Sequence, residues 1–307
     1  MARKRNDGPT GFAVVDKEPG WTSHDVVAKA RGILKTRKIG HSGTLDPDAT
    51  GVLLLGVGKA TRILRFLDGA TKSYTGEIVF GTETASLDSS GEVTATHDMG
   101  DRIDVAEART AAEALTGDID QIPPMVSAKK VDGKRLHELA REGIEIERKA
   151  VPVSVYRFEL EATDDPMVLR CSVDCSAGTY IRSLAADLGT TMGGGAHLRN
   201  LRRTAIGSFT DDLAEPLEAV TVRPAADLLR DLDPVTVDRE IAIDVSFGRI
   251  LPLELLGGAR PGPYPVLDES GALLAVYETH RNGTAKPSVV LVEPTKPTEP
   301  PDTEEPS

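Results

Sequence analysis

The sequence holds only two cysteines among its 307 residues, Cys171 and Cys175. Two thiols cannot build a disulfide framework, and four residues apart on one strand they would stand roughly 13 Å from each other. They also lack the companion ligands that a zinc site needs. We therefore expect both cysteines to be packing residues.

Long hydrophobic runs are missing too. No stretch reaches the ~18 apolar residues of a membrane span. The first ten residues carry Arg3, Lys4 and Arg5 but lead into no apolar segment of the kind that follows the basic start of a secretory signal. We therefore expect a cytoplasmic protein without a membrane partner. The length suffices for one large domain and one small domain, each with its own core.

An overall positive charge is absent, since the net charge is -12. Binding to phosphates needs local lysine and arginine, and these are segregated: residues 1–66 hold 12 Lys/Arg against 6 Asp/Glu. An acidic protein with such basic stretches can bind RNA through one face, although ordinary solvated charge is the alternative. Two further basic clusters comprise Lys129, Lys130, Lys134 and Arg135, and Arg199, Arg202 and Arg203.

The apolar spacing predicts strands and helices without regular βαβ alternation. It favours an α+β fold whose mixed, largely antiparallel central sheet is flanked by helices and loops. Thr22 with Asp25, and Asp104 with Glu107, form N-terminal capping patterns of two of the helices. The expected strands cover residues 12–17, 52–57, 72–80, 151–162 and 167–175, and the expected helices begin near residues 22, 104 and 178.

Composition shifts predict the domain organisation. We expect a catalytic domain at 1–235, within which residues 123–150 form a projecting basic arm, and a small β-rich module at 239–293. A charged, proline-containing join at 232–238 separates them. Residues 294–307 are acidic and proline-rich with nothing to bury, so we expect a disordered tail.

The segment GHSGTLDPDATG, residues 40–51, has the composition of a tightly turned loop. Asp46 precedes Pro47, which favours extended backbone and suits a carboxylate presented at a cleft. Three interpretations remain open from the residues alone. Asp46 forms an ordinary Asx-turn, it serves catalysis, or it joins Asp48 in holding magnesium for a phosphotransferase. The Gly56 to Lys59 stretch lacks the spacing of a phosphate-binding P-loop.

This loop resembles the signature of the TruB family of pseudouridine synthases, Gly-His-x-Gly-x-Leu-Asp-Pro-x-Ala-x-Gly, with every fixed position filled. The resemblance covers roughly residues 11–210, and one departure is Glu18, where the family commonly has proline. Other segments agree in family order: VVDKEPGWTS, TKSYTGEIVFGTETASLD, QIPPMVSAKKVDGKRLHELAREG, AGTYIRSLAADLG and GAHLRNLRRTAIG.

The resemblance implies the pseudouridine synthase fold with a PUA-like C-terminal module, and isomerisation of uridine 55 in the T stem-loop of tRNA. Asp46 would be the nucleophile, attacking either the uracil ring or the ribose C1′. Arg182 would pair with Asp46 and lower its pKa, and Tyr74 would stack on the base. An isomerisation requires no cofactor. We expect a monomer, and an RNA-binding protein that assists tRNA folding on the same scaffold is the alternative.

The family also implies residues that extract the uridine from its stack. His41 would fill the vacated space, and Leu201 would contact the flipped base. The arm would grip the RNA. Charge and segment position add the phosphate contacts Lys17, Lys129, Lys130, Arg202 and Arg203.

Overall fold

The computed structural model describes residues 8–125, 130–131, 134–135, 148–258 and 262–294. The predicted disordered tail, Lys129 and most of the predicted arm therefore lie outside the described residues.

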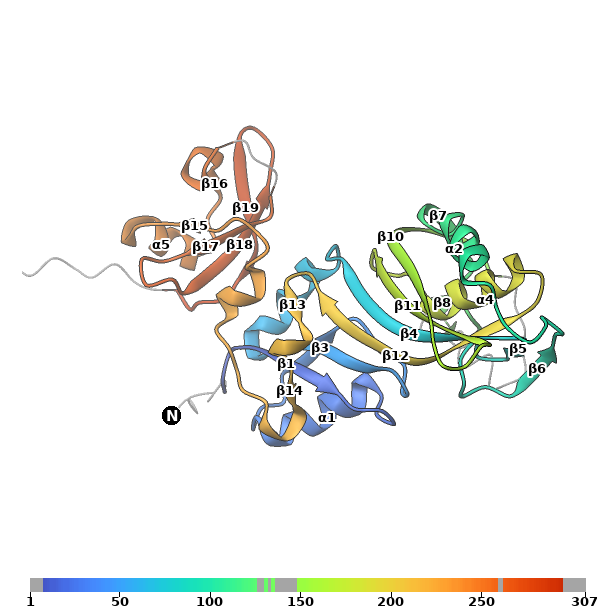
Figure 1. The fold of residues 1–307 in the computed structure, drawn as a ribbon. Coiled ribbons are helices and arrows are strands. Elements are labelled where there is room, and N and C mark those ends of the chain that lie inside the picture. The colour runs from blue at the N-terminus through green and yellow to red at the C-terminus, as the bar shows by residue number, and fades with distance from the viewer. Residues whose placement is uncertain (1–7, 126–129, 132–133, 136–147, 259–261, 295–307) are drawn as a thin grey trace, which may run out of the picture.

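A ten-stranded mixed sheet forms the centre of the molecule (Figure 1). Its strand order is β14-β1-β3-β12-β4-β11-β10-β7, with β2 paired to β3 and β13 to β12. Only the β1–β14 and β3–β12 pairs are parallel, so the predicted mixed, largely antiparallel sheet is confirmed. The strands are β1 (Gly11–Lys17), β2 (Ile39–Ser42), β3 (Thr50–Val57), β4 (Lys72–Phe80), β7 (Gly117–Gln121), β10 (Val151–Ala162), β11 (Val168–Cys175), β12 (Ala196–Ile206), β13 (Phe209–Thr210) and β14 (Glu215–Pro216).

The helices of this part begin where the caps predict. In α1 (Ser23–Ile33), Thr22 and Asp25 form the reciprocal capping box, and Asp104 caps α2 (Val105–Glu113). The third helix, α4 (Ile181–Thr191), begins later than the predicted Gly178. Gly178 has a φ of 87°, in the left-handed region, and therefore cannot belong to a right-handed helix.

Shorter elements complete the first part of the chain. Two 3₁₀ helices, η1 (Gly58–Arg62) and η2 (Leu64–Leu67), connect β3 to β4. The hairpin of β5 (Thr82–Thr84) and β6 (Val93–Thr96) follows β4. In the predicted arm, β8 (Lys130–Val131) pairs with β9 (Lys134–Arg135). Further 3₁₀ turns are η3 (Asp211–Leu213), η4 (Leu217–Ala219) and η5 (Ala225–Leu229).

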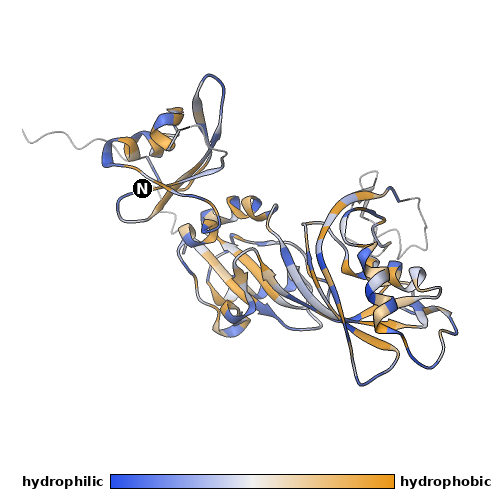
Figure 2. Ribbon diagram, turned by 45° about the horizontal axis from the view of Figure 1, so that its top comes forward, coloured by the Kyte–Doolittle hydropathy of each residue, from blue (hydrophilic) through white to orange (hydrophobic). Residues whose placement is uncertain are grey.

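Apolar side chains on both faces of the sheet make the core, and Figure 2 shows hydrophobic segments along its strands. On one face, β4, β11 and β12 pack against α2 and α4. On the same face, β1 and β3 pack against α1. The opposite face of β1 and β3 packs against η1, η2 and η5. Cys171 and Cys175 are free thiols buried in the first of these clusters, which confirms their prediction as packing residues.

A second, five-stranded sheet follows in the order β15-β17-β18-β19-β16. It lies beyond the β1–β3 end of the large sheet, away from α2 and α4 (Figure 1). The first strand of this sheet begins at Val235. We predicted the first domain to end at that residue, so the predicted boundary falls on the edge of the second sheet. The elements are β15 (Val235–Thr236), α5 (Arg239–Ser246), β16 (Leu251–Pro252), η6 (Leu253–Leu256), β17 (Tyr264–Leu267), β18 (Leu273–Thr279) and β19 (Thr284–Val290).

The small sheet packs directly on the large part. Leu273 and Val276 share a buried cluster with Leu64 and Leu228. Arg62 donates a hydrogen bond of 2.9 Å to the backbone carbonyl of Val290 across the same junction. None of the helices in the described ranges is long and apolar enough to cross a membrane.

Candidate active site

The loop between β2 and β3 carries Asp46, and backbone contacts hold it in place. The Leu45 amide donates to the Ser23 hydroxyl at 2.9 Å. The carbonyl of Pro47 accepts hydrogen bonds from the Gly20 amide at 2.9 Å and from Lys17 Nζ at 2.8 Å. The turn after β1 and the start of α1 therefore fix the loop on both sides of the carboxylate.

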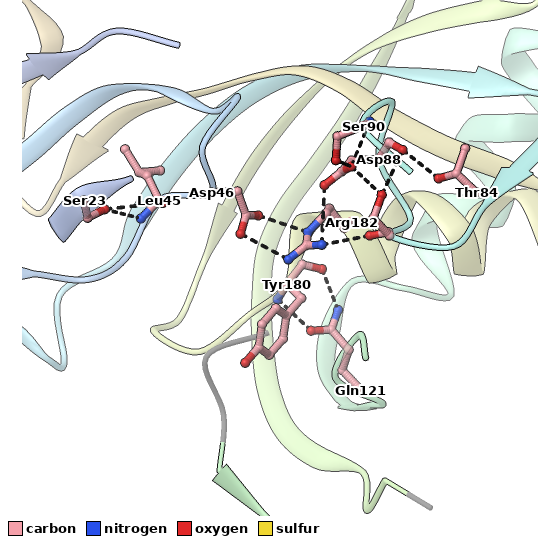
Figure 3. A network of polar contacts seen from close by, with 10 residues as sticks. Ser23, Leu45, Asp46, Thr84, Asp88, Ser90, Gln121, Tyr180 and Arg182 are labelled. Atoms are coloured by element: carbon pink, nitrogen blue, oxygen red, sulfur yellow. Dashed lines mark hydrogen bonds and ion pairs between the residues drawn. The ribbon is translucent and has the colours of Figure 1, made fainter. Parts of the chain in front are cut away.

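Arg182, at the start of α4, lies between two carboxylates (Figure 3). Its Nε is 3.0 Å from Asp46 Oδ2 and its Nη2 is 3.2 Å from Asp46 Oδ1, which is a bidentate pair. Its Nη1 is 3.4 Å from Asp88 Oδ2 and donates to the Ser86 carbonyl at 2.8 Å. The guanidinium is nearly inaccessible to solvent, whereas the Asp46 side chain is 39% exposed. The arrangement presents an anchored carboxylate to the outside.

Asp46 opens into a cavity of about 340 Å³, enough to admit one nucleobase with part of its sugar. The floor is formed by β4 and β12, and the walls by the Asp46 loop and the start of α4. Residues from four separated segments thus meet at one cavity: its lining includes Asp46, Lys72, Tyr74, Arg182, Leu201 and Arg203.

Burial raises the pKa of Asp46 above the ordinary value of an aspartate, and the Arg182 guanidinium opposes that rise. Arg182 therefore lowers the pKa of Asp46, as predicted, but the net shift is upward. The physical reason is that desolvation of the carboxylate outweighs the pairing. Asp88, on the far side of Arg182, raises the pKa of Asp46 further.

Tyr74 lies on the cavity floor, on the face of β4 that alternation predicts to be buried. Arg203 on β12 stands opposite it in the sheet register. Burial raises the pKa of the Tyr74 hydroxyl, and Arg203 opposes this through charge and a hydrogen bond. Leu201 joins Tyr74 at the cavity, so the structure brings together Asp46, Tyr74, Arg182 and Leu201 as the resemblance implies.

His41 lies on β2, at the start of the same loop, and its ring meets that of His24 on α1 edge to face, with centroids 5.2 Å apart. Burial lowers the pKa of His41 most, and the charge of His24 lowers it further. Its Nδ1 is buried without a hydrogen-bond partner among the described residues. A neutral, half-buried imidazole of this kind suits stacking better than ion pairing.

Two predicted phosphate contacts are corrected by the structure. Lys17 and Arg203 are each only 1% exposed. Lys17 donates to the carbonyls of Glu18 and Pro47, and Arg203 donates to those of Val52 and Gly43. Both cations stabilise the backbone around the Asp46 loop and cannot reach an RNA backbone at the surface.

The other predicted phosphate contacts stay predictions. Arg202 is half-buried, with a bidentate pair to Asp16 at 2.9 and 3.2 Å, and must leave that partner to bind a phosphate. Lys130 lies in β8 of the arm hairpin. Lys129 lies outside the described residues.

The buried Lys17 predicts a pH-dependent stability. Burial lowers its pKa to about 8, whereas the unfolded chain has the ordinary value of 10.5. Between these values the unfolded state binds more protons, so the Lys17 contribution to stability rises with pH. We expect the difference in unfolding free energy between wild type and Lys17→Met to grow in favour of wild type from pH 8 to 10.5. Urea denaturation at both ends tests this, and a constant or shrinking difference contradicts it.

Sequence reasoning missed Asp88 and Lys72. Asp88 lies in a serine-rich turn after β5, where its Oδ1 accepts hydrogen bonds from Ser86 and Ser90, and such a turn looks ordinary in sequence. Lys72 stands two residues before Tyr74, so extending the alternation of β4 by one step would have placed it on the cavity face. The described residues contain no cluster of three or more histidine, cysteine, aspartate or glutamate side chains fit to hold a metal ion.

Comparisons with known proteins agree with this geometry. The family model for the TruB family pseudouridylate synthase N-terminal domain matches residues 31–181, and that for the tRNA pseudouridylate synthase B C-terminal domain matches residues 182–235. The tRNA pseudouridine synthase B of Rhodococcus jostii is 45% identical over 294 residues, covering 92% of this chain and 94% of the relative. That of Arthrobacter sp. (strain FB24) is 40% identical over 303 residues, covering 92% and 96%.

Solved structures match in fold. The Cbf5 chain of a Cbf5-Nop10-Gar1 complex superposes with a TM-score of 0.67 at 24% identity, covering 92% of this chain and 84% of that one. A chain of an H/ACA RNP bound to a substrate RNA superposes with a TM-score of 0.69 at 23% identity, covering 92% and 85%. These likenesses confirm the predicted pseudouridine synthase fold. Together with the family models and the curated relatives they establish that the chain belongs to the TruB family of tRNA pseudouridine synthases.

Proposed function

We propose that the protein isomerises uridine 55 in the T stem-loop of tRNA to pseudouridine, with Asp46 as the nucleophile. Family membership supports the tRNA uridine-to-pseudouridine reaction. The observation that supports the residue assignment is the carboxylate of Asp46, held bidentately by Arg182 at the open side of a nucleoside-sized cavity.

The chemistry follows from this geometry. Two hydrogen bonds from Arg182 fix both oxygens of Asp46, so the carboxylate approaches a bound nucleoside in one orientation. Attack on the ribose C1′ forms an ester as the C1′–N1 bond breaks, and the electron pair stays with the uracil. Attack on C6 instead adds the carboxylate to the ring. In the second route the C1′–N1 bond breaks after this addition. In both routes C5 then bonds to C1′, the Asp46 carboxylate is released, and the proton lost from C5 is balanced by one that N1 takes up.

The cavity accounts for the need to extrude the base. A uridine stacked inside a folded loop cannot reach the Asp46 carboxylate, so the RNA has to flip it out. In the cavity, the ring stacks on Tyr74 and contacts Leu201, while the neutral imidazole of His41 occupies the space left in the RNA. The arm hairpin and the second sheet then hold the outer parts of a single tRNA, which one copy of the chain, acting as a monomer in the cytoplasm, can grip.

The test uses purified protein and an unmodified tRNA transcript in EDTA, with pseudouridine formation measured over time. Product under these conditions supports the proposal. RNA binding without product favours a tRNA-folding protein. If the protein acts only on a phosphate ester and only when magnesium is present, the result favours the alternative in which Asp46 and Asp48 hold magnesium for a phosphotransferase.

Asp88→Asn is expected to slow the reaction roughly 10-fold at neutral pH while the affinity for tRNA stays constant, because Arg182 loses one of its two anchoring carboxylates. The Asp88 charge also raises the pKa of Asp46, so its removal lowers that pKa. The acid side of the pH–rate profile should therefore move to lower pH. Asp101→Asn, at an exposed position, is the matched control. An unchanged rate and profile for Asp88→Asn would contradict this role.

A further inference from the structure

The floor of the cavity holds a lysine that the reaction described above does not use. Lys72 begins β4 and lies on the same face as Tyr74, two residues on. It lines the cavity and is only 7% exposed. Within the described part of the chain, no hydrogen bond or ion pair is made by its ammonium, although buried lysines are ordinarily paired.

Its surroundings do not supply a partner. In the sheet register Lys72 stands opposite Cys175 of β11 and Ile206 of β12. Burial lowers the pKa of Lys72, and the nearby guanidinium of Arg203 lowers it further, whereas Cys175 and Asp68 act in the opposite sense. Arg203 is itself bound to backbone carbonyls, so Lys72 contributes the uncommitted donor on this floor.

The Lys72 side chain is buried, but Nζ is not among the fully enclosed polar atoms of the described residues that lack a partner, so its tip faces the cavity. A partly desolvated ammonium without a protein partner destabilises the folded protein, and a ligand in the cavity that accepts its hydrogen bonds offsets that cost. The acceptor belongs to the part of the substrate that enters deepest. Lys72 lies beside Tyr74, the residue on which the base stacks, whereas a phosphate of the RNA backbone stays at the cavity mouth. The polar groups of a uracil ring that can accept hydrogen bonds are its two carbonyl oxygens, O2 and O4.

We propose that the Lys72 ammonium donates a hydrogen bond to a carbonyl oxygen of the flipped uracil and stabilises the negative charge that develops there. The inference rests on the proposed function. When the C1′–N1 bond breaks, the electron pair left on N1 spreads to both O2 and O4. When the carboxylate adds to C6, the electron pair of the C5–C6 double bond moves onto O4. A cation at O4 therefore assists either route, and a cation at O2 assists departure from C1′.

The experiment combines a protein change with a change of single substrate atoms. Stem-loop RNAs carrying uridine, 2-thiouridine or 4-thiouridine at the target position are processed by wild type and by Lys72→Met in single-turnover reactions. Sulfur accepts hydrogen bonds weakly, so it removes the partner of Lys72 without changing the protein. Lys72→Gln, which retains a donor but no charge, provides a second variant, and Lys29→Met removes an exposed lysine as the matched control.

With uridine, Lys72→Met should be slower by on the order of 100-fold, as for other donors to a developing oxyanion. One thio substitution should slow wild type about 10-fold more than it slows Lys72→Met, since only wild type has a hydrogen bond to lose. One ammonium can reach only one of the two oxygens, so coupling at O2 fits departure from C1′, whereas coupling at O4 fits either route. Lys29→Met should behave as wild type throughout.

Two results overturn the inference. One is an equal thio effect in wild type and in the Lys72 variants, and the other is weaker RNA binding by Lys72→Met with an unchanged rate when bound, which would assign the ammonium to a phosphate. If neither variant folds, wild type that is slowed by neither thio substitution is sufficient to reject it. Because wild type must convert the uridine RNA first, failure of the proposed function is seen separately.

Discussion

Asp46→Asn is expected to form no measurable pseudouridine, with a rate reduced by on the order of 10⁴-fold or more, because an amide cannot serve as the nucleophile. The substitution retains the size of the side chain, and one amide oxygen still accepts from the Arg182 guanidinium. Affinity for tRNA should therefore change little. Single-turnover pseudouridine formation and filter binding of the same transcript measure the two quantities.

Asp48→Asn is the matched control for this variant, since Asp48 is exposed on the same loop and makes no ion pair in the described residues. It should retain most of the activity. If Asp46→Asn and Asp48→Asn fail together, the pair acts as a unit, as carboxylates that hold a metal ion do. If Asp46→Asn remains active, Asp46 is not the nucleophile.

Arg182→Met is expected to lower both the stability and the rate. It leaves the carboxylates of Asp46 and Asp88 without their shared cation in a half-buried site, which destabilises the fold by about 1–3 kcal/mol, less than for a fully buried pair because solvent reaches both carboxylates. It also removes the charge that opposes the rise in the pKa of Asp46. The acid limb of the pH–rate profile should therefore move to higher pH, and the rate at neutral pH should fall roughly 100-fold.

The double variant Arg182→Met/Asp88→Asn separates the two effects. Removing one of the two stranded carboxylates should recover part of the lost unfolding free energy, measured by urea denaturation, while the rate stays low. Arg182→Lys should remain slow as well, because one ammonium cannot form the bidentate pair with Asp46 and also reach Asp88. A stability loss that is the same in the single and double variants would contradict the proposed network.

Local sequence patterns predicted those parts of the fold that local physics decides. The capping box at Thr22, the N-cap at Asp104 and the alternation of β4 were predicted correctly because a few neighbouring residues determine them. The start of α4 was placed three residues early, because the left-handed backbone of Gly178 cannot be distinguished in sequence from a helical glycine. Strand order and register depend on contacts between distant segments, and only the family resemblance implied the fold they form.

The site residues also divide into those that the sequence could predict and those that depend on the folded structure. Asp46, Tyr74, Arg182 and Leu201 were predicted from the resemblance, and the structure brings them to one cavity. Lys17 and Arg203 were assigned to phosphates because sequence shows charge but not burial. Their carbonyl partners come from distant backbone, such as Pro47 for Lys17 and Val52 for Arg203. The net rise in the pKa of Asp46 could not be predicted from sequence either, since desolvation is a property of the folded cavity.

The measurement that tests the central claim most directly is nucleotide-resolution mapping of pseudouridine in a full-length tRNA transcript incubated with wild type or Asp46→Asn. We predict one modified position, uridine 55 of the T stem-loop, with wild type and none with the variant. Pseudouridine at that position with both proteins, or at other positions instead, would contradict the assignment of the Asp46 carboxylate to an extruded uridine.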